Sequence, residues 1–88
     1  MVNLTLLTQP ACGYCDQAKE IISRLSIDFA LNIREVDLET EEGRALAIQN
    51  AVMFAPGIFL NGKLFSYGRL SEKKLRLRLT KEYETESA

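Results

Sequence analysis

Two cysteines stand three positions apart in the segment Cys12-Gly13-Tyr14-Cys15, and the chain contains no others. Residues at positions i and i+3 of a helix lie on one face, so these two sulfurs can form a disulfide with little backbone movement. A crosslink that closes so short a loop constrains the unfolded chain very little and therefore stabilises a fold only slightly. The spacing thus predicts redox chemistry or metal binding rather than a structural crosslink.

Metal binding through this pair is the weaker of these two interpretations. A closed structural zinc site takes four ligands, and the chain has no histidine and no third cysteine. Two copies of the chain would supply four sulfurs, but thiols placed to bond with each other argue against that arrangement. No metal site is therefore expected, and redox chemistry is favoured.

Length and composition limit the number of domains, the cellular location and the partners expected for this chain. With 88 residues the chain is expected to form a single domain over positions 1–88, and none of its apolar runs is long enough to cross a bilayer. The first residues enter a strand-like pattern at once, without the basic start and apolar core of a secretory signal. We therefore expect a cytoplasmic monomer without a membrane partner. A net charge of −1 with no basic cluster disfavours nucleic acid as a partner.

The segments on either side of the cysteine pair predict a strand followed by a helix. Val2–Thr8 is a short aliphatic and β-branched run that ends at Gln9-Pro10, which is typical of a strand buried on both faces. The arrangement places Cys12 at the N-cap of a helix that begins near Gly13. Apolar side chains recur along that helix at three- and four-residue steps: Tyr14, Ala18, Ile21, Ile22 and Leu25.

The middle of the chain predicts a second strand and a second helix. Residues 27–36 have the composition of a strand, and the acidic stretch 37–42 with Thr40 suits a helix start, with the helix ending at Asn50. The inward residues of the strand are expected to be Phe29, Leu31, Ile33 and Val36.

The last third of the chain predicts a hairpin and a final helix. Asn61-Gly62 suits a tight two-residue turn between strands at Ile58–Leu60 and Lys63–Tyr67. Gly68 ends the second strand, and Ser71 with Glu72 behind it predicts the next helix start. Residues 81–88 are polar and are expected to fray. Apolar contacts from the final helix are assigned to Leu70, Leu75, Leu77 and Leu79.

Two stretches of the chain resemble motifs of the glutaredoxins and small thioredoxins of the thioredoxin superfamily. Residues 7–15 resemble the strand end and active site of that family, and Ala55-Pro56 ahead of residues 58–63 resembles its second motif. The resemblance covers nearly the whole chain. It implies an α/β protein with the thioredoxin fold, in the order β-α-β-α-β-β-α, whose four-stranded mixed sheet is flanked by three helices. It also implies that Pro56 is cis and faces the cysteines, which sequence alone does not show because most Xaa-Pro bonds are trans.

Several positions depart from the usual patterns of the family. Gly13-Tyr14 combines the first residue typical of thioredoxins with the second residue typical of glutaredoxins. Ala55 stands where glutathione-binding members commonly have valine, and residues 66–71 resemble the thioredoxin ending. Leu6 occupies the place of the buried acid of many thioredoxins. Glutathione therefore stays open as a ligand, and proton transfer at Cys15 is expected to use water or another group.

The resemblance and the helix position together imply a thiol–disulfide oxidoreductase that reduces protein or small-molecule disulfides. A helix N-terminus stabilises a thiolate through its unpaired N–H groups and its dipole, so Cys12 is expected to be the attacking sulfur. Cys15 then attacks the mixed disulfide and leaves a redox-active Cys12–Cys15 disulfide. No tightly bound cofactor is expected. The implied partners are disulfide-bearing proteins, with glutathione or a thioredoxin reductase as electron donor.

Substrate binding is expected around the cysteine pair and the proline. An extended peptide is expected to pair with the backbone of Ala55, in the manner of an added strand. Tyr14, Phe54 and Tyr67 supply an apolar rim, although core packing is an equal alternative for Phe54 and Tyr67. Lys63 and Arg69 are either carboxylate-binding groups or solvated charges. The residues assigned to substrate binding are Gly13, Tyr14, Ala55, Pro56 and Tyr67, and those assigned to the core are Leu6, Ile33, Ile58 and Phe59.

Two further functions stay open. Some glutaredoxins with glycine after the first cysteine hold a [2Fe-2S] cluster between two subunits, with glutathione completing the four sulfur ligands. Gly13 permits comparison with such a cluster-binding or carrier protein. A non-catalytic binding module is the third interpretation, which the two thiols at reactive spacing disfavour.

Overall fold

The computed structural model describes residues 1–87, which form three helices around one sheet. The order β-α-β-α-β-β-α is confirmed. No helix in this described range combines the length and hydropathy that a bilayer crossing requires. The elements are β1 (Val2–Thr8), α1 (Gly13–Asp28), β2 (Leu31–Asp37), α2 (Glu41–Gln49), β3 (Gly57–Leu60), β4 (Lys63–Tyr67) and α3 (Glu72–Ser87).

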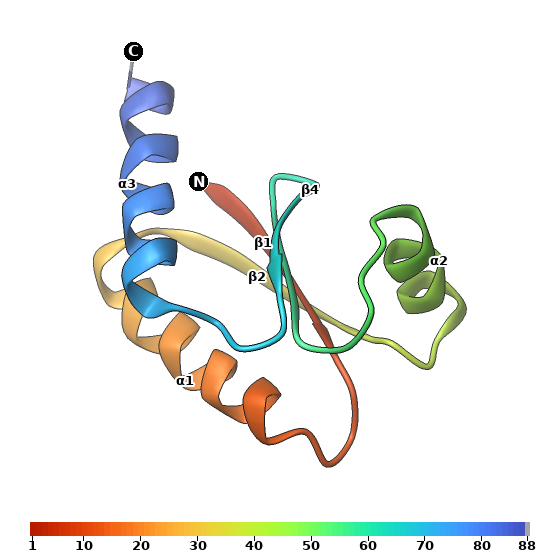
Figure 1. The fold of residues 1–88 in the computed structure, drawn as a ribbon. Helices are drawn as coiled ribbons and strands as arrows, with labels where there is room; N and C mark the ends of the chain where they lie inside the picture. Colours follow the sequence, from red (N-terminus) through yellow and green to blue (C-terminus); the bar gives the residue numbers. More distant parts are fainter. Residues whose placement is uncertain (88) are drawn as a thin grey trace.

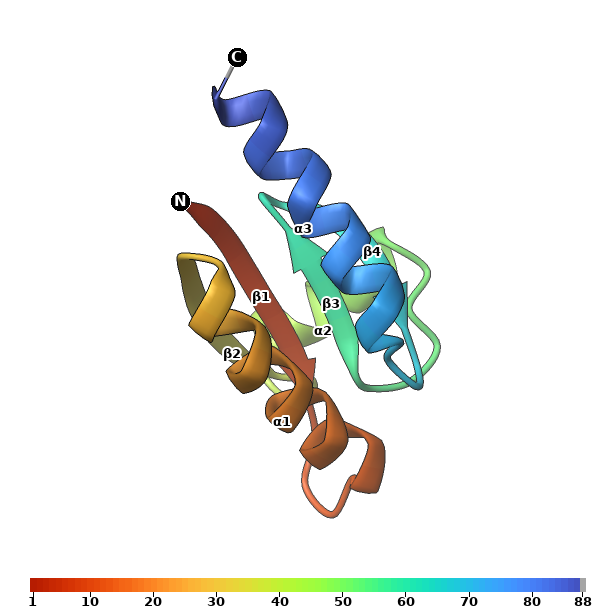
Figure 2. The ribbon, with the colours of Figure 1, turned by 90° about the vertical axis from the view of Figure 1, so that its left-hand side faces the viewer.

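The four strands form a mixed sheet in the order β2-β1-β3-β4. β1 runs parallel to β2 and antiparallel to β3, which pairs antiparallel with β4 through the hairpin. Helices α1 and α3 cover one face of the sheet and α2 covers the other, as Figures 1 and 2 show. This is the predicted thioredoxin fold, and it carries the end of β1 and the start of α1 to one end of the molecule.

The central strand β1 is buried on both of its faces, as predicted. Val2, Leu4 and Leu6 point to the side of α1 and α3, whereas Leu7 points to the side of α2. This follows from the two-residue alternation of side chains along a strand. The two neighbouring strands complete its hydrogen bonding, so β1 is a rigid platform for the loop that follows it.

Two hydrophobic clusters of unequal size hold the helices to the sheet. Eleven buried residues form the larger cluster, and they come from strands β1 and β3, helices α1 and α3, and the loop before α3. The smaller cluster lies under α2 and contains five buried residues, which are Leu7, Val36, Ala47, Val52 and Phe59. The predicted core positions Leu6, Ile58 and Phe59 are confirmed, each at 1% exposure or less.

The second strand begins later than predicted. Residues 27 and 28 belong to α1, where Ile27 is 83% exposed, and the strand starts at Leu31. Phe29 is the C-cap residue of α1, and its N–H donates to the carbonyl of Leu25 over 2.9 Å. Ile33 is 42% exposed, so its assignment to the core is wrong. The reason is that β2 is an edge strand, where one flank of each side chain has no neighbouring strand.

The last helix extends further than predicted. The expectation that residues 81–88 fray is wrong for the described part, because α3 continues to Ser87; Ala88 lies outside the described residues. Tyr83 packs on Phe29 with ring centroids 5.8 Å apart, and its hydroxyl donates to the carbonyl of Ala30. Leu77 is 58% exposed and makes no core contact, whereas Leu70, Leu75 and Leu79 are buried as predicted.

Two ion pairs join α1 to α3 at the molecular surface. Arg24 donates to Glu72 over 2.7 Å, and Arg76 donates to Asp28 over 2.9 Å. The hydrogen bond from Arg24, together with its charge, lowers the pKa of Glu72 below its ordinary value of 4.5. The carboxylate form of Glu72 is therefore favoured by the folded chain.

The Arg24–Glu72 pair predicts a small loss of stability in acid. Because the pKa of Glu72 is lowered by folding, the contribution of the pair is present above the ordinary pKa of 4.5 and is lost as pH falls through the folded value. Arg24→Gln should slightly lower the free energy of unfolding in urea at neutral pH, and the difference should vanish in acid. Arg44→Gln is the control, because Arg44 has no ion-pair partner among the described residues. A difference that stays constant with pH would contradict the assignment.

Candidate active site

The first cysteine is the N-cap residue of α1, as predicted. The chain leaves β1, passes Ala11 with a positive φ of 52°, and enters the helix from an extended Cys12 with φ −116° and ψ 105°. The sulfur of Cys12 accepts the N–H of Cys15 over 3.1 Å, which satisfies one of the free N–H groups of the first turn. The sequence thus places a sulfur where the helix end is positive.

The two cysteines are joined in a disulfide, with Cα atoms 5.2 Å apart. This Cα separation lies in the range that a disulfide requires. The two sulfurs differ in their access to solvent, because Cys12 is partly exposed whereas Cys15 is only 1% exposed. A molecule that approaches this end of the structure therefore reaches Cys12 first.

Pro56 lies beside the disulfide on the loop between α2 and β3. The Ala55–Pro56 bond is cis, as the resemblance implies, and Pro56 is fully buried. The carbonyl oxygen of Ala55 lies 4.0 Å from the sulfur of Cys12. The carbonyl oxygen of Pro56 accepts the N–H of Gly68 over 2.7 Å, which fixes this loop to the end of β4.

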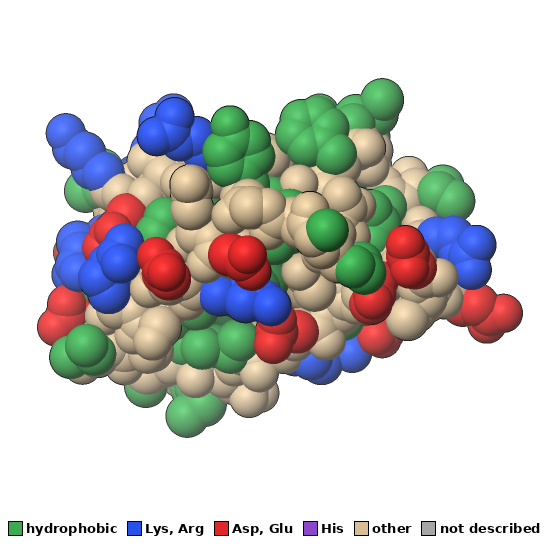
Figure 3. All heavy atoms as spheres, turned by 90° about the horizontal axis from the view of Figure 1, so that it is seen from below, with side chains coloured by type: hydrophobic (Ala, Val, Ile, Leu, Met, Phe, Trp, Pro, Cys, Tyr) green, Lys and Arg blue, Asp and Glu red, His purple; other side chains and the backbone are tan. Residues whose placement is uncertain are grey.

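Aromatic side chains surround this loop at the surface. Phe54 and Tyr67 are 53% and 38% exposed, and their rings meet edge to face with centroids 5.3 Å apart. The alternative that both pack in the core is therefore wrong. Tyr14 is 50% exposed and follows Gly13, which is exposed and has open space around it. Figure 3 looks onto this end of the molecule, where hydrophobic side chains reach the surface among charged ones.

Two residues of this region were not predicted as part of the site. Met53 is 75% exposed next to Phe54. Gly68 has a φ of 85°, which favours glycine, and a Cβ there would lie 3.0 Å from the Phe54 ring, so glycine lets the ring come this close without strain. The available signals were the uncharged stretch before Pro56 and the glycine directly after Tyr67.

The two predicted carboxylate-binding cations lie apart from each other. Lys63 begins β4 opposite Leu60, whereas Tyr67 at the other end of β4 pairs with Gly57 beside the proline. Lys63 lies four residue steps along the strand from that end, or about 13 Å. Lys63 is therefore not part of the site. Arg69 follows Gly68 and lines a cavity between β4 and α3.

A family model named Glutaredoxin matches residues 4–65, a stretch that includes both cysteines, Ala55 and Pro56. The chain belongs to the glutaredoxin family. Membership in this family, together with the Cys12–Cys15 pair at disulfide distance, supports thiol–disulfide oxidoreductase chemistry for this glutaredoxin-family chain.

Curated relatives of this glutaredoxin-family chain carry the name probable thioredoxin. One from Archaeoglobus fulgidus is 28% identical over 76 residues, which cover 86% of this chain and 84% of the relative. Another, from Methanothermobacter thermautotrophicus, is 28% identical over 86 residues, which cover 96% of this chain and 99% of the relative. The similarity to these short proteins thus extends over nearly the whole length.

Solved structures show the same fold. A mutant thioredoxin from Halobacterium salinarum has a TM-score of 0.69 at 21% identity, over 91% of this chain and 73% of that one. A thioredoxin-like protein from Clostridium perfringens has a TM-score of 0.75 at 18% identity, over 92% of this chain and 70% of that one. The thioredoxin fold of this glutaredoxin-family chain is thereby established.

Proposed function

We propose that the chain is a dithiol reductase that reduces disulfides in proteins or small molecules, with Cys12 as the nucleophile. One observation supports this role above the others: the partly exposed sulfur of Cys12 caps α1, and its partner Cys15 lies buried one turn inward. The N–H of Cys15 and the dipole of α1 favour a thiolate over a thiol at Cys12 in the reduced protein. A thiolate is the form of cysteine that attacks disulfides.

The reaction proceeds through two exchanges. The Cys12 thiolate attacks one sulfur of the substrate disulfide, forms a mixed disulfide and releases the other substrate sulfur as a thiolate. Cys15 then loses its proton and attacks the sulfur of Cys12, which releases the second substrate thiolate. The substrate gains two electrons, and the products bind two protons. The protein is left with the Cys12–Cys15 disulfide that the structure contains.

Proton transfer from Cys15 uses water or the departing substrate thiolate. Leu6 occupies the position of the buried acid found in many thioredoxins, and its side chain is 1% exposed. No charged side chain is buried among the described residues. The proton of Cys15 therefore passes to water or to the substrate thiolate that the first exchange released.

Substrate binding uses the surface beside the disulfide. An extended substrate segment pairs with the backbone of Ala55, next to Pro56, which brings its disulfide to the sulfur of Cys12. Gly13 has open space where a side chain would stand, which leaves room for a substrate at the start of α1, and Tyr14 and Tyr67 add apolar contact. Electrons return from glutathione or a thioredoxin reductase, and the protein acts as a cytoplasmic monomer.

Two disulfide substrates and two donors test this function. Insulin and a glutathione mixed disulfide are each offered to the reduced protein, with either glutathione or a flavin-dependent thioredoxin reductase as donor. Turnover of either substrate supports the reductase function. The donor that sustains this turnover is then assigned as the electron donor of the protein. Absence of turnover with every combination, together with visible absorbance from a [2Fe-2S] cluster, would instead favour the cluster-binding alternative.

The exposed ring of Phe54 predicts a preference for protein substrates. Phe54→Ala should lower kcat/KM for insulin about 5- to 10-fold, because it removes apolar contact area from the substrate-binding surface beside the disulfide. The same variant should change kcat/KM for a glutathione mixed disulfide less than 2-fold (about 0.4 kcal/mol). Ile48→Ala is the control, since Ile48 is 81% exposed on α2. An equal loss with both substrates would assign Phe54 to the folded structure rather than to docking.

A further inference from the structure

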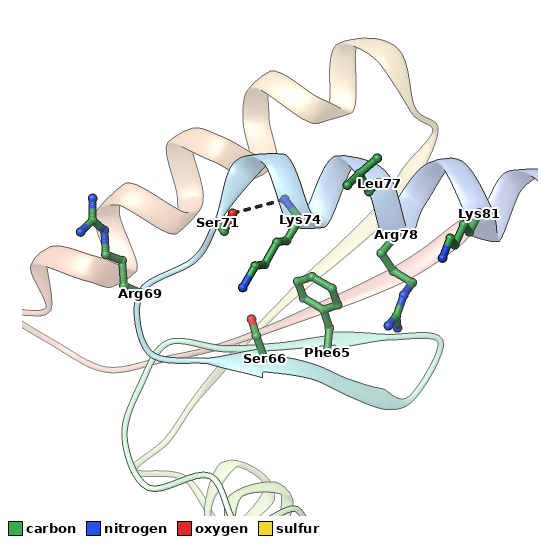
Figure 4. Close-up of a pocket in the computed structure, with 8 residues that line it drawn as sticks. All are labelled: Phe65, Ser66, Arg69, Ser71, Lys74, Leu77, Arg78 and Lys81. Carbon is green, nitrogen blue, oxygen red and sulfur yellow. Dashed lines mark hydrogen bonds between the residues drawn. The ribbon is translucent and has the colours of Figure 1, made fainter.

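A cavity of about 430 Å³ lies between β4 and α3. Neither cysteine lines it, and neither does Ala55 or Pro56, so it is separate from the disulfide. Figure 4 shows its walls, with one side formed by the strand and the other by the helix. The volume lies in the range of pockets that hold small organic molecules.

Four basic side chains line this cavity, and no acidic one does. They are Arg69, Lys74, Arg78 and Lys81, three of which recur along α3 at four- and three-residue steps and so share one helix face. This concentration of positive charge occurs in a chain whose net charge is −1. The basic residues are spread along the sequence among leucines, and the helix gathers them on one side.

Three of these cations lack an acidic partner among the described side chains. Arg69, Lys74 and Arg78 form no ion pair with any residue in the described part of the chain. By contrast, Arg24 and Arg76 on the neighbouring surface are each bound to a carboxylate. Like charges placed on one helix face repel each other, and an anion in the cavity relieves that repulsion.

A buried hydroxyl lies beneath the strand side of the cavity, under the side chain of Lys74 (Figure 4). The Oγ of Ser66 is buried and has no hydrogen-bond partner within the described residues. Figure 4 shows this hydroxyl directed toward α3, with the side chain of Lys74 extending down toward it. A buried hydroxyl without a partner is unfavourable, so a bound acceptor would satisfy it.

An aromatic ring holds one of the cations in place. The guanidinium of Arg78 lies over the ring of Phe65, 5.3 Å from its centroid. The start of α3 is satisfied internally, because the Oγ of Ser71 accepts the N–H of Lys74 over 3.2 Å. The side chains of Lys74 and Arg78, rather than the helix end, thus supply the donors of the cavity.

We propose that this cavity binds a small oxyanion that carries several negative charges, such as a diphosphate or a tricarboxylate. Lys74 and Arg78 provide charge-assisted hydrogen bonds, Ser66 donates one further hydrogen bond, and Arg69 and Lys81 add positive charge at the two ends. The ligand would occupy one face of the molecule while the disulfide stays accessible. This binding activity is independent of the proposed redox reaction.

Calorimetric titration of the full chain tests the site, with inorganic pyrophosphate and citrate as separate probes. We expect saturable binding of one probe molecule per chain. Binding of pyrophosphate alone assigns a phosphate ligand, and binding of citrate alone assigns a carboxylate ligand. Binding of both probes shows that the site selects its ligand by negative charge. Binding of neither probe overturns the site.

The sequence of α3 offers a matched pair of variants. Lys74→Ala should lower the affinity for the bound probe about 10-fold or more, as expected for loss of a charge-assisted hydrogen bond. Lys73→Ala removes the same charge one position away, from a residue that does not line the cavity, and should leave the affinity within about 2-fold. Equal losses from the two variants would show that only net charge matters, and would overturn the site.

Ser66→Ala gives a second, independent test of the proposed oxyanion site. Without a probe, removal of the unpartnered hydroxyl should leave Tm unchanged or higher. With the probe, the affinity should fall about 5-fold, because one hydrogen bond is lost. Full retention of affinity would exclude Ser66 from the site. Disulfide reduction by Lys74→Ala should equal that of the unmodified chain, which separates this test from the proposed reductase function.

Discussion

Cys12→Ser is expected to lower the turnover of every disulfide substrate by at least ~10³-fold, because it removes the attacking sulfur. The fold should survive, since serine is a favoured N-cap residue and its oxygen can accept the N–H of Cys15 as the sulfur does now. Circular dichroism of the variant should therefore match that of the unmodified chain. Turnover is measured with insulin and with a glutathione mixed disulfide.

Cys15→Ser is the informative companion variant. Cys15 is buried and is proposed to act only after the mixed disulfide has formed. The variant should therefore accumulate a covalent adduct between Cys12 and a protein substrate, visible by mass spectrometry. It should keep activity only on glutathione adducts, whose reduction needs a single protein thiol. If Cys12→Ser turned over substrate as fast as the unmodified chain, the assignment of the nucleophile would be wrong.

Gly43→Ala is expected to destabilise the fold by about 3 kcal/mol. Gly43 lies in the first turn of α2, where a Cβ would lie 2.0 Å from the backbone carbonyl oxygen of Asp37. That oxygen belongs to the end of β2 and cannot rotate away, so α2 must shift as a whole. The steric cost should exceed the gain of about 1 kcal/mol that alanine brings inside a helix. Urea denaturation measures the change.

Gly13→Ala is the matched control for this prediction. Gly13 is the first residue of α1, and a Cβ there has no atom within 4 Å. The substitution should therefore be neutral or should raise the free energy of unfolding by up to about 1 kcal/mol. If both alanine variants shifted stability in the same direction, the close contact of α2 with β2 would not be what selects glycine at position 43.

Elements whose signals are local could be predicted from the sequence. The strand at Val2–Thr8, the N-cap at Cys12 and the hairpin at Asn61-Gly62 each depend on neighbouring residues, and each is found where predicted. The start of β2 was misplaced because residues 27–33 contain apolar residues at alternate positions that suit a strand, while Ile27 also continues α1. Only the packing of the helix end decides between these two structures.

In the candidate site, too, features with a local sequence signal could be predicted, and features that depend on packing could not. The cysteine spacing is visible in the sequence, whereas the cis bond before Pro56 came from the family resemblance. The contact of Gly68 with Phe54 joins residues 14 positions apart through the folding of β3 and β4, so no local pattern shows it. Similarly, the lack of a partner for Ser66 is a property of packing between β4 and α3.

The unequal hydrophobic clusters on the two faces of the sheet have a consequence for local opening of the structure. α2 is held by a cluster of five buried residues, whereas α1 and α3 share one of eleven. Segments with less buried apolar contact open at lower free energy, so amide hydrogens of α2 should exchange with deuterium before those of β1 or α1. The chain from α2 leads directly into Ala55 and Pro56. Opening of α2 would therefore loosen the chain that leads to the proposed substrate-binding backbone, while the strand and helix that hold the two sulfurs stay closed.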